Sequence, residues 1–312
     1  MSIKTFFKLV EIQTKLASLF PFLIGTLFVM NYYGHLNILN TLVFFGSMLA
    51  FDMTTTAINN YMDYTKATSD EYRKNENIIG QKNIPERLVI AIIFTLLTIA
   101  IILGLYLVYL TNLLVLIIGL ICFAIGVFYT FGPIPISRMP LGEVFSGLTM
   151  GFGIVFLIVY VNAYDQGIID FVVQGQYISL EANIVEFAKI ILVSLPCVFT
   201  IAAVMLANNI CDLEQDIENK RYTLPYYIGK RRGIILFNTL YIGTFVAILF
   251  AVFLKLMPTF TLLTFIVIYP VYENVRRFNE KQIKAETFPV AIKNMVLVNG
   301  AIVAMLSISL ML

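Results

Sequence analysis

Two short stretches of the chain repeat one arrangement of amide and carboxylate side chains. The pattern Asn-Asn-x-x-Asp begins at Asn59 and again at Asn208, and each copy follows an apolar segment long enough to cross a bilayer. Residues four apart share a face of an α-helix, so Asn59 lies beside Asp63 and Asn208 beside Asp212. Asp216 extends the second face by one more turn. Both stretches therefore predict oxygen ligands gathered at a helix end.

The chemistry of such faces points to a cation. Two carboxylate faces that meet across one cavity repel by several kcal/mol at an effective dielectric constant of ~20. Oxygen ligands of this hard type suit Mg²⁺, which usually takes one or two carboxylates from a protein segment together with substrate phosphates. The spacing and central glycine of an EF-hand are absent, which argues against a Ca²⁺ loop. We therefore expect the paired motifs to bind Mg²⁺ and a diphosphate.

Composition places these motifs in a membrane protein. Of 312 residues, 59% are hydrophobic and 13% are charged, and the mean hydropathy is +0.87. The apolar stretches lack the alternating pattern of a membrane β-barrel, and each has the ~20 residues that a helix needs to cross a bilayer. We expect one all-α domain over 1–312, a bundle of nine transmembrane helices with polar cap loops. The expected spans lie near 16–33, 41–62, 88–110, 112–131, 142–163, 187–210, 232–254, 256–273 and 290–311, and residues 1–15 are expected along the membrane surface.

The basic residues predict which side of the membrane carries the motifs. Eighteen of the 21 Lys and Arg fall on one side. That side comprises the N-terminus with 63–87, 132–141, 211–232 and 274–289. By the positive-inside rule it is cytoplasmic, so we expect a plasma-membrane protein with the motif loops inside and the C-terminus outside. No basic cluster is interleaved with stacking aromatics, so no nucleic-acid partner is expected.

The two motifs resemble the aspartate-rich signatures of the UbiA superfamily of intramembrane aromatic prenyltransferases. Asn59-x-x-x-Asp63 with Asp70 looks like the first signature, and Asp212-x-x-x-Asp216 with the basic pair that follows it looks like the second. The resemblance extends over nearly the whole chain, with nine spans and motifs after the second and sixth. The first signature departs from the commonest form, since an asparagine follows Asn59 where an aspartate is frequent. Which of Asp63, Asp70 and Glu71 would touch metal is left open.

The resemblance implies a reaction. In such enzymes Mg²⁺ bridges the aspartates and the diphosphate of a polyprenyl donor, while basic residues neutralise the remaining charge. The candidates here are Lys66, Arg73, Lys74, Arg138, Lys220 and Arg221. The departing pyrophosphate leaves an allylic cation, which alkylates an electron-rich ring. Exclusion of water protects that cation, and the lipid bilayer accommodates the isoprenoid tail.

The acceptor is inferred from the segment YTFGPIPISRMPLGE, which begins at Tyr129. It looks like the corresponding segment of 1,4-dihydroxy-2-naphthoate polyprenyltransferases, the menaquinone branch, and Gln13-Thr14-Lys15 looks like the first span of that branch. The resemblance implies attack at the ring carbon that bears the carboxylate, followed by loss of CO₂. Tyr129 is a candidate substrate-binding residue, and Lys15 or Arg138 is a candidate for the carboxylate. Asp52 is an acid within the second span, and intramembrane acids are functional candidates.

Other functions stay open at this stage. The same chemistry is compatible with another acceptor, such as 4-hydroxybenzoate, homogentisate, haem or a glycerol phosphate lipid. An ion-coupled transporter also uses paired acidic motifs, but its site should lie near the midplane, whereas both motifs here are at the rim. The single histidine, His35, is expected on the far side from both motifs, which leaves a nucleophilic triad without a base.

Overall fold

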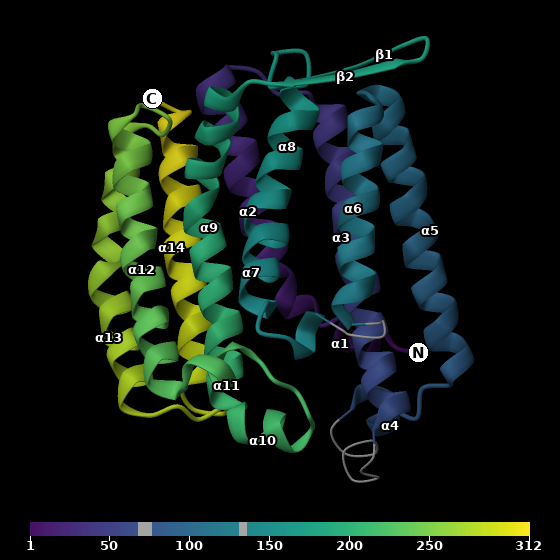
Figure 1. The fold of residues 1–312 in the computed structure, drawn as a ribbon, viewed down its shortest axis with the longest axis vertical. Coiled ribbons are helices and arrows are strands. Elements are labelled where there is room, and N and C mark those ends of the chain that lie inside the picture. The colour runs from purple at the N-terminus through teal and green to yellow at the C-terminus, as the bar shows by residue number, and fades with distance from the viewer. Residues whose placement is uncertain (68–76, 131–135) are drawn as a thin grey trace.

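The structure is a computed structural model that describes residues 1–67, 77–130 and 136–312. Long helices run between two ends of the molecule (Figure 1). One end carries the C-termini of helices α3 (Ile38–Lys66) and α9 (Ile184–Cys211), and we call it the motif end. The other carries a β-hairpin, and we call it the hairpin end. Both Asn-Asn-x-x-Asp motifs therefore lie at the same end, as their places after the second and sixth expected spans predicted.

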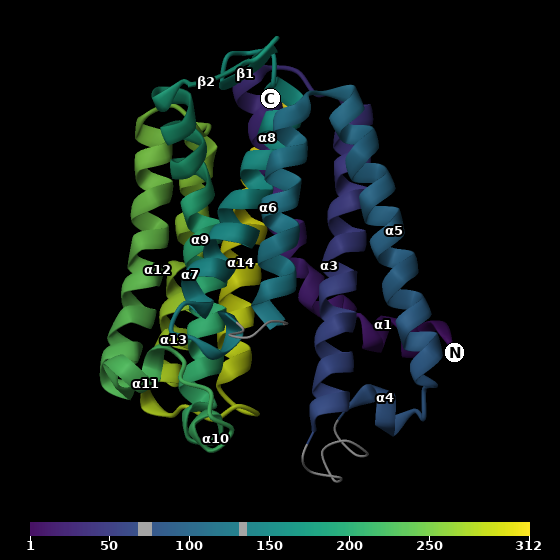
Figure 2. The same ribbon diagram turned by 45° about the vertical axis from the view of Figure 1, so that its right-hand side comes forward.

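The first half of the chain builds one side of the molecule. Its helical elements are α1 (Ile3–Leu9), η1 (Ile12–Lys15), α2 (Leu16–Phe28), η2 (Val29–Tyr33), α3, α4 (Ile78–Gln81), α5 (Glu86–Leu110) and α6 (Leu113–Thr130). The side chain of Asn37 caps α3 by accepting a hydrogen bond from the backbone N–H of Asn40 at 3.0 Å, which satisfies one orphan donor of the first turn. The short helix α1 lies crosswise to the long helices at the motif end (Figure 2).

Near its start, the second half of the chain has three consecutive helical pieces over residues 142–163, which we call the helical rod. The C-terminus of the chain lies at the hairpin end. The elements of the second half are η4 (Ile136–Arg138), α7 (Gly142–Ser146), η5 (Gly147–Gly153), α8 (Ile154–Ala163), β1 (Ile169–Gln174), β2 (Tyr177–Ala182), α9, α10 (Leu213–Glu218), α11 (Leu224–Ile228), α12 (Lys230–Phe253), η6 (Thr259–Val267), α13 (Ile268–Glu280) and α14 (Phe288–Ser309). Strands β1 and β2 pair antiparallel from Ile169 with Ala182 to Gln174 with Tyr177. The all-helical expectation thus holds for the bundle, but not for this connection.

The number of spans differs from the expectation. Within the described residues, seven helices are long and apolar enough to cross a membrane, and Leu113–Tyr129 forms a shorter apolar helix. The stretch expected at 256–273 is not one α-helix, because the 3₁₀-helix η6 gives way to α13 at Ile268. The count of nine is therefore not confirmed.

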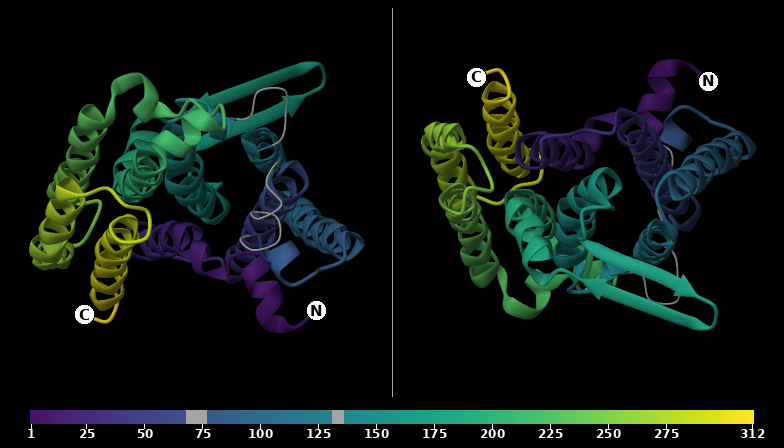
Figure 3. Two further views of the ribbon diagram at one scale, coloured as in Figure 1. Left: turned by 90° about the horizontal axis from the view of Figure 1, so that it is seen from below. Right: turned by 90° about the horizontal axis from the view of Figure 1, so that it is seen from above.

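The helices pack into two groups joined through the middle. Helix α3 packs along α5, and α9 packs along α12 and α14. Between these groups α2 packs against α8, and both also contact α9. Seen along the bundle from either end, α3, α5 and α6 stand apart from α12, α13 and α14 (Figure 3). The elements α2, α8 and α9 therefore join the two groups of helices.

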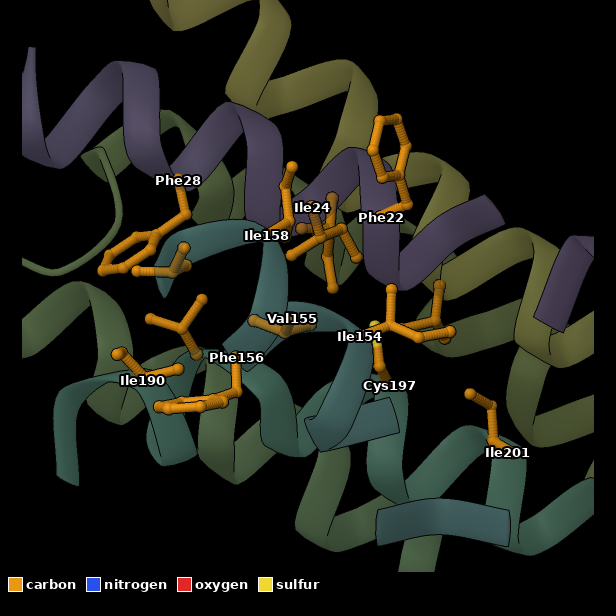
Figure 4. Packing of buried hydrophobic residues seen from close by; sticks show 14 of the residues in the cluster. Phe22, Ile24, Phe28, Ile154, Val155, Phe156, Ile158, Ile190, Cys197 and Ile201 are labelled. Carbon is orange, nitrogen blue, oxygen red and sulfur yellow. The ribbon is translucent and has the colours of Figure 1, made fainter. Parts of the chain in front are cut away.

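Buried side chains of α2 and α8 form the joint between the halves. Phe28 and Ile24 of α2 face Val155 and Ile158 of α8, and all four are fully buried (Figure 4). A small residue allows the contact, since a Cβ on Gly25 would lie 2.2 Å from Ile158 Cγ2. Small residues let membrane helices approach closely.

A second close contact joins the helical rod to α9. A Cβ on Gly147 would lie 3.0 Å from the backbone oxygen of Val198, and one on Gly151 would lie 2.6 Å from the Cα of Val198. The turns that carry these glycines are π-helical. The pair Gly147-x-x-x-Gly151 therefore serves packing within the bundle.

Candidate functional site

A cavity of about 830 Å³ opens between the two halves of the bundle. Helix α3 supplies its polar wall through Asp52, Thr56, Asn59 and Asp63. These positions are i, i+4, i+7 and i+11, the period of one helical face, so a single stripe of α3 points into the cavity. The first motif thus lies at one end of a polar stripe that continues into the bundle.

The remaining walls of the cavity are mostly apolar. Helices α5 and α6 contribute most of these side chains, among them Leu97, Ile101, Leu105, Leu116, Leu120 and Phe123. Leu157 of α8 and Met205 of α9 line it from the opposite half. The cavity is therefore amphipathic, with a space that suits a hydrocarbon chain beside a face that suits charge.

Lys15 and Asp52 form a buried ion pair in the wall of this cavity. Lys15 Nζ lies 2.5 Å from Asp52 Oδ1, and it also donates to Thr56 Oγ1 at 2.6 Å and to the backbone oxygen of Asp52 at 3.1 Å. Ser18 Oγ donates to Asp52 Oδ2 at 2.6 Å. All three ammonium donors of Lys15 therefore have partners within the protein.

At the second motif, the ligand oxygens converge on a cation of the protein itself. Lys284, in the connection between α13 and α14, donates to both Asn208 Oδ1 and Asp212 Oδ2. Asn208 Nδ2 also donates to Asp212 Oδ2 at 3.3 Å. The predicted i, i+4 face is thus present, and its two oxygens already bind one positive charge.

The backbone carries this face beyond the end of α9. The N–H of Asp212 donates to the carbonyl of Asn208 at 3.0 Å, and the N–H of Asp216 donates to the carbonyl of Asp212 at 2.7 Å. Asp216 nevertheless turns toward the segment after α10, where Arg221 Nε lies 3.4 Å from its Oδ1 and Thr223 Oγ1 lies 3.5 Å from its Oδ2. Asn208 and Asp212 therefore share the partner Lys284, whereas Asp216 has a different set of partners.

Asp216 is buried, which changes its acid strength. Burial raises the pKa of Asp216 above its ordinary value, and the nearby Asp212 carboxylate raises it further, whereas the Arg221 guanidinium lowers it. Lys220 makes this pairing possible, because it adopts a left-handed conformation (φ 56°) that ends α10 and returns the chain. The N–H of Arg221 then donates to the carbonyl of Asp216 at 2.8 Å.

The loop with Arg138 lies against this returning chain. Tyr222 N–H donates to the carbonyl of Arg138 at 3.1 Å, and Arg221 Nη2 donates to the carbonyl of Ser137 at 3.4 Å. The Arg138 side chain is exposed. The structure thus brings the basic residues of two loops together at the motif end, beside the second motif.

Tyr129 connects the cavity to a buried polar pair on the other half. It lines the cavity, and its hydroxyl lies 3.8 Å from Met205 Sδ. Behind it, Asn209 Nδ2 donates to Glu143 Oε1 at 2.9 Å, and Glu143 Oε2 is buried and has no hydrogen-bond partner among the described residues. A buried carboxylate oxygen without a partner is costly, so the position of Glu143 calls for an explanation beyond packing.

Several of the predicted site residues are placed by the structure and others are not. Asn59, Asp63, Lys15 and Tyr129 line the cavity, whereas Asn208, Asp212 and Asp216 belong to the neighbouring motif end of α9 and α10. Lys66 is the last residue of α3. Asp70, Glu71, Arg73 and Lys74 lie outside the described residues. Among the residues described, no three Asp, Glu, His or Cys side chains gather into a metal-binding group.

Sequence reasoning missed two functional candidates. Lys284 is 72 residues from Asp212, and only its place in a basic loop could have suggested it. Glu143 was part of the segment that suggested the acceptor, but its burial against Asn209 depends on the packing of α7 on α9. His35 lies at the hairpin end against the carbonyl of Asn162, far from both motifs as expected.

Comparison with known proteins agrees with this architecture. Residues 18–295 match the family described as the UbiA prenyltransferase family. The chain is similar to the 1,4-dihydroxy-2-naphthoate octaprenyltransferase of Bacillus subtilis (strain 168), with 30% identity over 226 residues. The match covers 72% of this chain and 66% of the relative, so the chain spans just under two thirds of that relative's length.

Solved structures share the fold. A UbiA homologue from Aeropyrum pernix K1, solved in the apo state, has a TM-score of 0.67 at 14% identity and covers 94% of this chain and 98% of its own. A UbiA homologue from Archaeoglobus fulgidus bound to GPP and Mg²⁺ has a TM-score of 0.63 at 13% identity, with coverage of 99% and 100%. At these identities the likeness concerns the fold.

Proposed function

The chain belongs to the UbiA prenyltransferase family, and on that premise we propose that it transfers a polyprenyl group from a polyprenyl diphosphate to 1,4-dihydroxy-2-naphthoate. The observation that carries this proposal is the amphipathic cavity, in which the first motif and an apolar chamber belong to one space of about 830 Å³. Such a space accommodates a ligand with one charged end and a hydrocarbon tail. The naphthoate is favoured by the likeness to the Bacillus subtilis relative.

The motif end of the bundle is the proposed site of the diphosphate and Mg²⁺. The residues fit a hard cation, because Asn208 and Asp212 already direct two oxygens at the Lys284 ammonium, and Asn59 and Asp63 offer the same ligand types. Bound Mg²⁺ would supply Lewis-acid stabilisation of the departing diphosphate. Asp63, Asp70, Asp212 and Asp216 are the proposed carboxylate ligands.

Basic side chains of the motif end would hold the negative charge of the leaving group. Arg221 is suited to this role because its Nε is buried and makes no hydrogen bond within the described part of the chain, although Asp216 lies nearby. Guanidinium groups match phosphate oxygens in geometry. The other proposed partners of the diphosphate are Lys66, Arg73, Lys74, Arg138 and Lys220. By the distribution of Lys and Arg, the motif end and the N-terminus face the cytoplasm and the C-terminus faces outside.

The apolar walls would protect the reaction from water. When the C–O bond of the donor breaks, its electron pair leaves with the diphosphate, and an allylic cation remains beside α5 and α6. The ring carbon that bears the carboxylate supplies the electron pair of the new C–C bond. Loss of CO₂ then returns electrons to the ring and restores its aromaticity. The expected product is a demethylmenaquinol.

A membrane assay tests this proposal. Membranes that contain the chain are supplied with a polyprenyl diphosphate and either 1,4-dihydroxy-2-naphthoate or 4-hydroxybenzoate, each with and without Mg²⁺. We expect prenylation of the naphthoate with CO₂ release, only when Mg²⁺ is present. Prenylation of the benzoate alone would correct the acceptor and keep the family reaction. Turnover of the naphthoate after complete removal of divalent metal would contradict the proposed role of Mg²⁺.

Removal of the Lys284 ammonium is expected to tighten binding of a divalent cation in the absence of donor. In Lys284→Met the oxygens of Asn208 and Asp212 lose their internal cation. Because the Lys284 side chain is 45% exposed, the competing ion pair contributes about 0.2–1 kcal/mol, so Mn²⁺ affinity should rise by at most about fivefold. Titration of the purified protein with Mn²⁺ measures this, with Lys281→Met in the same connection as the control. Weaker Mn²⁺ binding in Lys284→Met than in the control would contradict it.

A further inference from the structure

The ion pair of Lys15 and Asp52 is a buried charge centre that the proposed function has not used. Both residues line the cavity. Their side chains are 6% and 15% exposed, so neither is solvated as a surface charge would be. Keeping two ions in this position costs desolvation energy, which only a close pair with further hydrogen bonds offsets.

The two partners differ in what they can still bind. Lys15 has spent its three donors on Asp52 and Thr56, as described above. Asp52 accepts one side-chain hydrogen bond at each oxygen, from Lys15 and from Ser18. An ionised carboxylate has about four lone-pair sites, so each oxygen of Asp52 can accept once more. Asp52 is therefore the member of the pair that can take a hydrogen bond from a ligand in the cavity.

Its place on α3 relates Asp52 to the first motif. Asp52 lies seven residues before Asn59 on the same face, which corresponds to roughly 10 Å along the helix axis. A donor whose diphosphate lies at Asn59 and Asp63 would place its first isoprene unit between the motif and Asp52. A hydroxylated ring that attacks that unit would then have its hydroxyl within reach of the carboxylate.

We propose that the Asp52 carboxylate accepts the proton of the acceptor's ring hydroxyl, and that Lys15 positions Asp52 for this step. This inference rests on the proposed function. The O–H bond of the acceptor breaks, its proton goes to Asp52, and its electrons pass through the ring to the carbon that forms the new bond to the allylic cation. After CO₂ leaves, the ring oxygen takes the proton back from Asp52, so the carboxylate is regenerated.

The surroundings of Asp52 single it out for this role. Among the described residues, the other charged side chains that line the cavity are Glu11, Lys15 and Asp63, and its other titratable groups are Tyr129 and Cys122. Glu11 accepts a hydrogen bond from Asn60 at 3.2 Å, which ties it to the junction of α3 with the N-terminal segment. Asp63 belongs to the diphosphate end. From α2, the polar neighbour of Asp52 is Ser18.

The test is the pH dependence of Asp52→Asn with a hydroxylated acceptor and saturating donor. A positioned base contributes about 100- to 10,000-fold, so we expect a loss of at least about 100-fold at neutral pH. The loss should shrink as the pH rises and the ring hydroxyl ionises without help. Binding of the donor with Mn²⁺ should stay as in the unaltered protein, since the motif residues are intact. Thr54→Val, a buried neighbour on α3 outside the cavity, serves as the control with unchanged rate.

A second variant separates the loss of the base from misfolding. It is needed because Asp52→Asn leaves the Lys15 ammonium buried without its counter-ion. Lys15→Met with Asp52→Asn removes both charges, and we expect it to fold and to show the same pH-dependent loss. A loss that is uniform over the pH range in both variants would indicate a structural role and overturn the proposal. So would rates within about threefold of the unaltered protein.

The proposed function and this inference fail in different ways. If the unaltered protein prenylates the naphthoate and the Asp52 variants keep its rate, only the role of Asp52 is lost. If it prenylates 4-hydroxybenzoate instead, the acceptor is corrected, and the same pH profile decides the role of Asp52 with that phenol. If the unaltered protein is inactive with every hydroxylated ring tested, both the proposed function and the role of Asp52 are overturned.

Discussion

Asp63→Asn is expected to lower turnover by about 100- to 1,000-fold while the protein stays folded. The change keeps the size of the side chain, but it removes the negative charge of the first motif at the end of the polar stripe on α3. Loss of one group that stabilises developing charge typically has this effect on kcat. The measurement is the prenylation rate at saturating donor and acceptor, together with the thermal transition in detergent. Near-normal turnover in Asp63→Asn would contradict the proposed metal role.

Matched controls separate this loss from a general effect of charge. Asp170→Asn makes the same change on the β-hairpin at the opposite end of the molecule, so its rate should equal that of the unaltered protein. Asp212→Asn should match Asp63→Asn, because both motifs are proposed to bind one metal cluster. A normal rate in Asp212→Asn beside a large loss in Asp63→Asn would show that the motifs act separately.

The second large effect concerns folding. Gly151→Ala is expected to destabilise the bundle by about 1–3 kcal/mol, the usual cost of overpacking, or to prevent its assembly. The added Cβ would lie 2.6 Å from the Cα of Val198 and 2.7 Å from its backbone nitrogen, and backbone atoms of a packed helix cannot rotate away. The yield of monodisperse protein and its thermal transition measure this effect.

Gly300→Ala is the control for that substitution. Its Cβ would lie 3.8 Å from the ring of Phe20, an ordinary contact, and alanine favours the helical conformation. We therefore expect the yield and transition of Gly300→Ala to be those of the unaltered protein or slightly better. If both glycine variants behaved alike, the close contact between η5 and α9 would not limit stability.

The helices and the faces of both motifs were predictable because they depend on residues close together in the chain. Hydropathy over windows of about 20 residues located most of the long helices, and the helical period placed Asn208 beside Asp212 and Asn59 beside Asp63. The segment after Leu256 was predicted less well. Its composition is apolar, but it begins as a 3₁₀-helix and continues as α13, a change of backbone geometry that hydropathy does not report.

The sequence by itself therefore determined an α-helical membrane protein with two acidic motifs at one end. The tertiary structure decided which side chains meet. Lys284 contacts Asp212 across 72 residues, and Lys15 contacts Asp52 across 37. Each of these ion pairs joins segments whose relative position depends on how whole helices pack. The physical reason is that a local period fixes the face of one helix, whereas a contact between two helices depends on their separation and rotation, which small residues such as Gly25 and Gly151 set.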